Sequence, residues 1–179
     1  MSLLPSRTRP RGPRRVTAVE LAIGFALGGS LLAVAVPTFA REIHASRLVE
    51  PVEGLGRIGA HAVAYAQSRP AARGFPTGAP LTPPVPPRGR CEADPPGTWE
   101  HPTWQDLDFR AAPEGAPHCF SFAFDSAASP AKSGFRAHAH ADLDGDGLTS
   151  TFEITGQYAD GDPRGPVIDP GIFVDAEFE

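Results

Sequence analysis

The sequence lacks the short motifs that mark the common catalytic sites. It contains no GxSxG nucleophile elbow, no HExxH zinc motif and no phosphate-binding P-loop. Its serines lie in polar turns without an evident histidine partner for nucleophilic catalysis. We therefore expect this protein not to be an enzyme.

Cysteine is scarce: the chain has only Cys91 and Cys119, which stand 28 positions apart. No CxxC pair or matching histidine spacing accompanies them, which disfavours a structural zinc site. Outside the cytoplasm the two thiols are expected to pair and close a loop, and such a crosslink is worth roughly 3–4 kcal/mol through the entropy of the unfolded chain. The alternative is two separate buried thiols.

Acidic residues are missing from the first fifteen positions, which carry five arginines. Without this leader (residues 1–15) the chain keeps 11 basic and 21 acidic side chains, a formal charge of −10. A body this acidic repels nucleic acid and attracts cations, so no nucleic-acid partner is expected. The arginine cluster is typical of the cytoplasmic flank of a membrane segment. The alternative is a disordered basic tail that touches polyanions.

Charge is almost absent from the next stretch as well. Residues 16–40 are apolar or uncharged apart from a single acid, Glu20. A carboxylate inside a bilayer costs roughly 2.5–3.5 kcal/mol on insertion scales. A lone acid near the end of a membrane segment therefore needs a partner or a role, and the candidate partner is an amine.

The run VTAVELAIGFALGGSLLAVAVPTF resembles the N-terminal helix of type IV pilins and of type II secretion pseudopilins. Those proteins carry a glutamate at the fifth mature position and a proline seventeen residues later, and here Glu20 and Pro37 have that spacing. The match makes Val16 the first mature residue. Arg15 stands where the family's leader nearly always ends in glycine, and Val16 replaces the usual phenylalanine.

This resemblance implies a structural subunit. In the family, a prepilin peptidase removes the leader, and the glutamate then neutralises an amine at the start of a neighbouring helix during assembly. Carried to this chain, Glu20 would pair with the amine of Val16 on another pilin-like subunit. The implied location is the inner membrane, spanned once, with a periplasmic globular region. After assembly the subunits would form an extracellular type IV pilus or a periplasm-spanning pseudopilus.

Composition divides the rest of the chain into three stretches. Residues 41–67 keep an apolar rhythm and are expected to continue one long helix from residue 16, kinked rather than ended by Pro37 and Pro51. Residues 68–99 are rich in Pro, Gly and Arg, which favours a loop. Residues 100–179 begin with a short helical or turn segment around Trp104 and continue with alternating apolar side chains, which predicts antiparallel strands.

The predicted fold class is α+β, with the long helix packed on a three- to four-stranded antiparallel sheet, which is also the pilin layout. The helix positions expected to face the sheet are Leu48, Val52, Leu55, Ile58, Ala62 and Tyr65. The strand positions expected on one face are Phe120, Phe122, Phe124, Phe135, Ala137, Ala139, Ala141, Phe152, Ile154, Tyr158, Ile172, Val174, Ala176 and Phe178. The length of 179 residues allows one such domain plus an anchor.

The sharpest local motif is the acidic loop at residues 142–153, DLDGDGLTSTFE. Its oxygen-bearing residues have the ligand spacing of an EF-hand calcium loop. The expected Ca²⁺ ligands are Asp142, Asp144, Asp146, the carbonyl of Leu148, Ser150 and Glu153. Strands replace the two flanking helices, so this would be an EF-like loop within a hairpin. The alternative is an Asp/Gly-rich turn whose charges are solvated.

Two other functions remain open. Arg15 favours an uncleaved signal anchor that holds a periplasmic calcium-binding domain and never polymerises, whereas the placement of Glu20 favours the polymer. Residues 38–40 would also serve as a signal-peptidase site that releases a soluble secreted protein. The mass of the mature protein separates the three hypotheses, because they remove residues 1–15, no residues, or residues 1–40.

Overall fold

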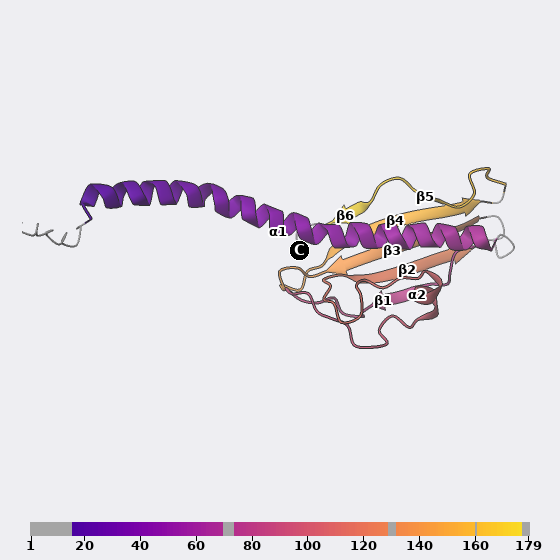
Figure 1. Cartoon of the computed structure of the whole chain (residues 1–179). Helices are drawn as coiled ribbons and strands as arrows, with labels where there is room; N and C mark the ends of the chain where they lie inside the picture. The colour runs from indigo at the N-terminus through magenta and orange to yellow at the C-terminus, as the bar shows by residue number, and fades with distance from the viewer. Residues whose placement is uncertain (1–15, 70–73, 129–131, 160, 177–179) are drawn as a thin grey trace, which may run out of the picture. The chain divides into compact units, whose positions relative to one another are not determined.

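The computed structural model describes residues 16–69, 74–128, 132–159 and 161–176, with the backbone alone for residues 40–47. The chain divides into two compact units, and the boundary lies between Ile43 and His44. The first unit is helical from Ala18 onwards. The second unit holds the remainder of that helix, a short second helix and all the described strands (Figure 1).

The helix α1 covers Ala18–Ser68, close to the predicted bounds, and it continues through Pro37 and Pro51. In the second unit its fully buried positions include Pro51, Leu55, Ile58 and Ala62. The predicted stripe is wrong at Val52, which is 45% exposed. The buried face is centred on Pro51 and Leu55, and at 100° per residue Val52 falls beyond its edge.

Among the described residues, six strands form one antiparallel sheet. They are β1 (Ala79–Thr82), β2 (Ser121–Ala128), β3 (Lys132–Ala141), β4 (Ser150–Ala159), β5 (Val167–Ile168) and β6 (Phe173–Asp175). The order is β1-β2-β3-β4-β5, and β6 also pairs with β4. The sequence predicted β2, β3, β4 and β6, so the α+β class and the antiparallel sheet are confirmed.

The structure corrects the prediction that residues 68–99 form only a loop, because β1 lies inside that range. β1 meets β2 at two registered positions, Ala79 with Phe124 and Thr82 with Phe122, with an irregularity between them. β5 has two residues and pairs with β4. Strands this short, the first of them interrupted by Pro80, show no alternation that a sequence pattern could reveal.

α1 lies across one face of the sheet in the second unit (Figure 1). Its Gly54 abuts the ring of Phe122 in β2, and its Gly59 abuts Ile154 in β4 and Ile168 in β5. The aromatic side chains of the sheet pack under this helix. The predicted core residues that are buried include Phe120, Phe122, Phe124, Phe135, Ala137, Ala139, Ala141, Phe152 and Ile154.

The C-terminal strand β6 is less buried than predicted. Ile172 is 37% and Val174 is 40% exposed, and Ala176 is also exposed. β6 is paired on one side only, with β4, and such an edge strand has no neighbour to cover its outer side. Phe178 lies outside the described residues.

The segment between β1 and β2 is closed by the predicted disulfide, Cys91–Cys119, which is present. The closed loop contains α2 (Pro102–Asp106). Trp104 of α2, together with Leu107 and Phe109, is buried in the core, as the sequence predicted. The loop therefore contributes part of the hydrophobic core and is more than a surface connection.

The two glycines at 54 and 56 give a matched test of helix packing. A Cβ at Gly54 would lie 2.6 Å from the buried Phe122 ring, whereas a Cβ at Gly56 would meet nothing within 4 Å. We expect Gly54→Ala to lower the free energy of unfolding by about 1–3 kcal/mol through overpacking. Gly56→Ala should raise it by about 0.5–1 kcal/mol through helix propensity. Chemical denaturation followed by tryptophan fluorescence measures both, and equal effects of the two substitutions would contradict the packing.

Candidate functional site

In the described part of the first unit, the helical span Ala18–Phe39, of 22 residues, is long and apolar enough to cross a membrane. Its large apolar side chains are exposed, for example Phe25 at 79% and Leu31 at 71%. Such a continuous apolar surface is unfavourable in water and is favourable in lipid or against other helices. By length and composition alone it is weak evidence for an anchor, since a signal sequence has the same properties.

Glu20 lies in the first turn of α1 and interacts with Thr17, just before the helix. The Glu20 carboxylate accepts hydrogen bonds from the Thr17 backbone N–H at 2.8 Å and from its hydroxyl at 3.0 Å. The Glu20 N–H in turn donates to the Thr17 hydroxyl oxygen at 3.2 Å. This reciprocal arrangement is a capping box, which satisfies N–H groups that a helix start leaves unpaired. Val16 precedes it and is exposed, and Arg15 lies outside the described residues.

The acidic loop joins β3 to β4, and it brings together three of the predicted metal ligands. Carboxylate oxygens of Asp142, Asp144 and Asp146 lie within 4.8 Å of one another. Asp142 is buried and accepts N–H bonds from Gly145 at 2.7 Å and Gly147 at 3.2 Å. Both glycines have positive φ, 86° and 96°, which side chains with a Cβ rarely adopt. These turns direct the three carboxylates to one place, where they could hold a metal ion.

The remaining predicted ligands of this loop are engaged elsewhere or exposed. Ser150 is buried in β4, and its hydroxyl donates to the Ala141 carbonyl at 3.2 Å. Glu153 lies three residues further along β4, forms an ion pair with Arg136 at 3.2 Å and contacts Nδ1 of His138 at 3.4 Å. Leu148 is 59% exposed, and its N–H donates to Asp146. The loop thus places three aspartates together, and it places Ser150 and Glu153 in the sheet.

Two histidines of β3 lie on the sheet face beside Glu153. His138 contacts Asp125 through Nε2 at 3.0 Å and Glu153 through Nδ1 at 3.4 Å. His140 contacts the Thr151 hydroxyl at 3.0 Å, and its ring stacks on that of His138. Burial, with a smaller effect from the His138 charge, lowers the pKa of His140. His138 thus contacts its two carboxylates through opposite ring nitrogens.

A second polar cluster, which the sequence reasoning missed, joins α1 to the disulfide-closed loop. The Glu50 carboxylate accepts N–H bonds from Cys119 at 3.0 Å and Phe120 at 2.9 Å. His118 lies 3.9 Å from Glu50 through Nδ1 and 2.6 Å from Asp94 through Nε2. The same Asp94 oxygen accepts the indole N–H of Trp99 at 2.6 Å. Glu50, His118, Asp94 and Trp99 therefore form one continuous chain of contacts, the Glu50–Trp99 chain.

The Glu50–Trp99 chain is mostly buried. The His118 side chain is 3%, that of Asp94 15% and that of Glu50 24% exposed. Burial raises the pKa of Glu50, while the Cys119 and Phe120 N–H groups and the His118 charge act in the opposite direction. The sequence gives a partial signal for Glu50. It stands four and eight residues before Gly54 and Ile58, which are buried, so helical periodicity places it on the buried face of α1. The partners of Glu50 come from positions about seventy residues away, and no local pattern could reveal them.

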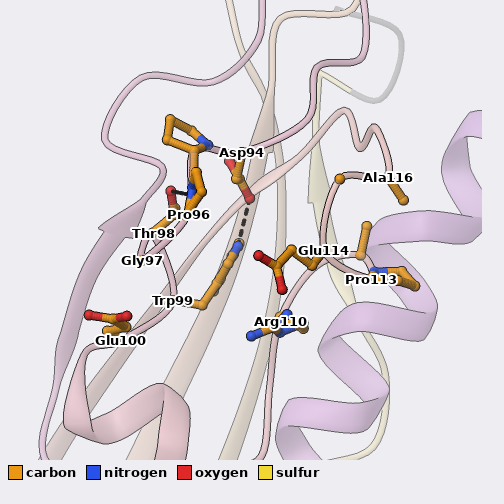
Figure 2. Close-up of a pocket in the computed structure, with 13 residues that line it drawn as sticks. Asp94, Pro96, Gly97, Thr98, Trp99, Glu100, Arg110, Pro113, Glu114 and Ala116 are labelled. Atoms are coloured by element: carbon orange, nitrogen blue, oxygen red, sulfur yellow. Dashed lines mark hydrogen bonds between the residues drawn. The ribbon is translucent and has the colours of Figure 1, made fainter.

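A surface pocket adjoins this chain (Figure 2). Its volume is about 190 Å³, and its walls come from residues 94–100, Arg110 and residues 112–116, all inside the disulfide-closed loop. Asp94 and Trp99 belong to the chain and to the pocket wall alike. The polar chain thus fixes the orientation of one wall of the pocket.

The pH dependence of stability tests the burial of Glu50. Its folded-state pKa is raised, so the folded state binds the proton more tightly, and the contribution of Glu50 to stability grows as pH falls through that raised pKa toward 4.5. Glu50→Gln removes this pH dependence. Glu50→Ala leaves two buried N–H groups without an acceptor and should cost about 1–3 kcal/mol. Denaturation between pH 7 and 4.5 measures both effects, with the exposed Glu53→Gln as control. A Glu50→Gln profile parallel to that of the wild type would contradict the assignment.

Comparison with protein-family models, with curated proteins and with solved structures finds no match to this chain. The functional argument therefore rests on its own residues: the apolar span with Glu20, the aspartate loop, and the Glu50–Trp99 chain with its pocket.

Proposed function

We propose that this chain is a pilin-like structural subunit, anchored in the inner membrane by residues 16–40 and assembled through that helix into a type IV pilus or a type II secretion pseudopilus. The observation that carries the proposal is an exposed apolar helical span with one acid in its first turn, Glu20, followed by a compact unit in which a helix packs on an antiparallel sheet. The spacing of Glu20 and Pro37 adds the resemblance to the pilin N-terminal helix.

The charge of Glu20 is the central element of this proposal. The capping box with Thr17 accounts for the hydrogen bonds of Glu20 within its own helix. A glutamine serves the same capping role, so capping alone does not require a charge in an apolar span. Pairing of the carboxylate with the freed Val16 amine of another subunit does require it. The partners in this proposal are a prepilin peptidase and other pilin-like subunits.

The aspartate loop adds a calcium site to the proposal. Asp142, Asp144 and Asp146 present hard oxygen ligands, which Ca²⁺ prefers, and their like charges repel one another without a cation. The Leu148 carbonyl completes the set in this proposal. A bound ion would stabilise the hairpin of β3 and β4, because it binds the folded loop and not the unfolded chain.

The second candidate function is a signal-anchored periplasmic calcium-binding domain that does not polymerise. Arg15 favours it, because arginine stands where the pilin leader has glycine. The intact mass of the membrane form decides between the two: loss of residues 1–15 supports the pilin-like subunit, and a chain that keeps them supports the anchor.

Glu20→Gln separates the assembly charge from the cap. We expect the variant to insert in the membrane with unchanged helix content, because glutamine preserves the capping box, and to be lost from the assembled fibre. The measurement is the amount of subunit in sheared or crosslinked fibres from cells that contain the assembly machinery. Thr17→Ala is the matched control, since it weakens the cap and keeps the charge, and it should still assemble. Fibres containing Glu20→Gln at the wild-type level would refute the assembly role.

Calcium addition tests the aspartate loop. We expect Ca²⁺ to raise the melting temperature of the EDTA-treated full chain, and saturation at about 100 times the dissociation constant corresponds to about 2.7 kcal/mol. Asp144→Asn should weaken this stabilisation, because it removes one charged ligand. Asp175→Asn, an exposed acid on β6, is the control and should respond like the wild type. Equal responses of the two variants would assign the effect to the general acidity of the surface.

A further inference from the structure

The strongest unassigned feature is the pocket in the disulfide-closed loop (Figure 2). Both of its walls belong to the loop between Cys91 and Cys119, so one covalent crosslink holds them in one closed segment. Its volume of about 190 Å³ is below the roughly 300–1,000 Å³ of sites for drug-sized ligands. A pocket of this size suits a single small ring.

Trp99 gives the pocket a rigid aromatic wall. Its indole N–H is fixed by Asp94, and its ring packs against Trp104 at 5.5 Å and Phe109 at 5.6 Å between centroids. The Asp94 oxygen is itself held by His118, whose Nδ1 lies 2.9 Å from the Phe120 carbonyl and therefore carries a proton there. A wall fixed in this way loses little conformational entropy when a ligand binds.

The buried Glu50–Trp99 chain supports a positioning role for these groups. Buried ion pairs contribute little net stability, and replacing one by packed apolar side chains is often neutral or stabilising. Burial of the Glu50 carboxylate removes it from water, and this raises its pKa. The Glu50–Trp99 chain ends in a hydrogen bond from the Trp99 indole N–H to Asp94, and this bond fixes the direction of the ring. Apolar packing alone would not fix that direction in the same way.

The rim of the pocket carries charges of both signs with free hydrogen-bonding capacity. Figure 2 shows the Glu114 side chain directed toward Trp99 and Arg110, and Glu100 directed away from them. Within the described part of the chain, the carboxylates of Glu100 and Glu114 and the guanidinium of Arg110 form no hydrogen bond or ion pair with another group. The pocket therefore offers acceptors and donors next to the indole of Trp99 and the rings of Pro95, Pro96 and Pro113.

The mixed rim selects the class of ligand. An anion would face the carboxylates of Glu100 and Glu114, and a simple cation would face Arg110, so both are disfavoured by charge. A fully apolar ligand would remove these charges from water without replacing their hydrogen bonds. A neutral ring with an apolar C–H face and several hydroxyls meets all of these conditions. It can stack on Trp99, donate to Glu114 and accept from Arg110.

We propose that the pocket between residues 94–100 and 110–116 is a binding site for a single neutral pyranose unit, free or at the end of a glycan. Trp99 stacks on the sugar face, and Glu114 and Arg110 hydrogen-bond to its hydroxyls. The Glu50–Trp99 chain positions the indole and does not touch the sugar. The site lies in the second unit and uses neither Glu20 nor the apolar span of residues 18–39, so it does not rest on the proposed assembly function.

Ligand binding to the full chain tests this assignment. The protein is held in a polyoxyethylene detergent, because detergents with sugar head groups would compete. The probes are glucose, galactose, mannose and N-acetylglucosamine at millimolar concentration, with alanine and tetramethylammonium chloride as zwitterionic and cationic alternatives. We expect at least one sugar to change the tryptophan fluorescence saturably. Trp99→Phe, which leaves only the buried Trp104 as reporter, should abolish that change.

Matched variants assign the binding to the pocket. Glu114→Gln and Arg110→Gln should each weaken sugar binding at least tenfold, while Glu92→Gln, an exposed acid of the same loop outside the pocket, should leave it unchanged. Circular dichroism and thermal melting confirm that each variant is folded. Disulfide reduction should weaken sugar binding as well. The proposal is overturned if the folded wild type binds none of the four sugars, if alanine or tetramethylammonium binds in their place, or if the pocket variants bind as tightly as Glu92→Gln.

Discussion

The structure of the second unit depends on how the carboxylate of Glu50 is satisfied. This single side chain of α1 accepts the N–H groups of Cys119 and Phe120, at the point where the disulfide-closed loop becomes β2. Glu50 therefore joins α1, the disulfide-closed loop and the start of β2. Apolar side chains make no hydrogen bonds and could not join them in this directional way. The contact ties α1 to a disulfide cysteine, Cys119, and to the residue just before β2, Phe120. The fixed orientation of Trp99 is connected to it through His118 and Asp94.

α1 carries a second isolated acid, Glu20, and both acids meet the same physical problem. A carboxylate in an apolar setting needs hydrogen-bond donors or an opposite charge. Glu50 obtains backbone N–H donors from a distant part of the chain, and they are fixed once the second unit has folded. Glu20 obtains its donors from Thr17, within its own helix start. These local hydrogen bonds leave the charge of Glu20 without an ionic partner among the described residues, and the proposed assembly function assigns it one.

Sequence periodicity predicted the parts of the fold that are held by local regularity. The alternation around Phe122, Phe135 and Phe152 identified the three central strands, because each is long enough to repeat the pattern and buries one face. The same reasoning missed β1 and β5, because these strands are too short to repeat the pattern. It also predicted too much burial for β6, because an edge strand can alternate without a layer that covers it. The aspartates of the acidic loop were found because a turn gathers neighbouring residues. Glu153 shows the limit of such spacing, because the strand directs it to Arg136 and His138.

The proline-rich segment illustrates how non-local pairing replaces intrinsic order. Its composition favours an extended chain without a core of its own. In the structure it is held by backbone contacts at three places: β1 pairs with β2, the Gly89 N–H donates to the Asp142 carbonyl at 2.7 Å, and Glu92 exchanges two hydrogen bonds with His118. The Gly89 contact reaches Asp142, the first residue of the acidic loop. The Glu92 contact reaches His118, a member of the Glu50–Trp99 chain. One backbone hydrogen bond therefore connects the aspartate loop to Gly89, two residues before Cys91, where the pocket-bearing loop begins.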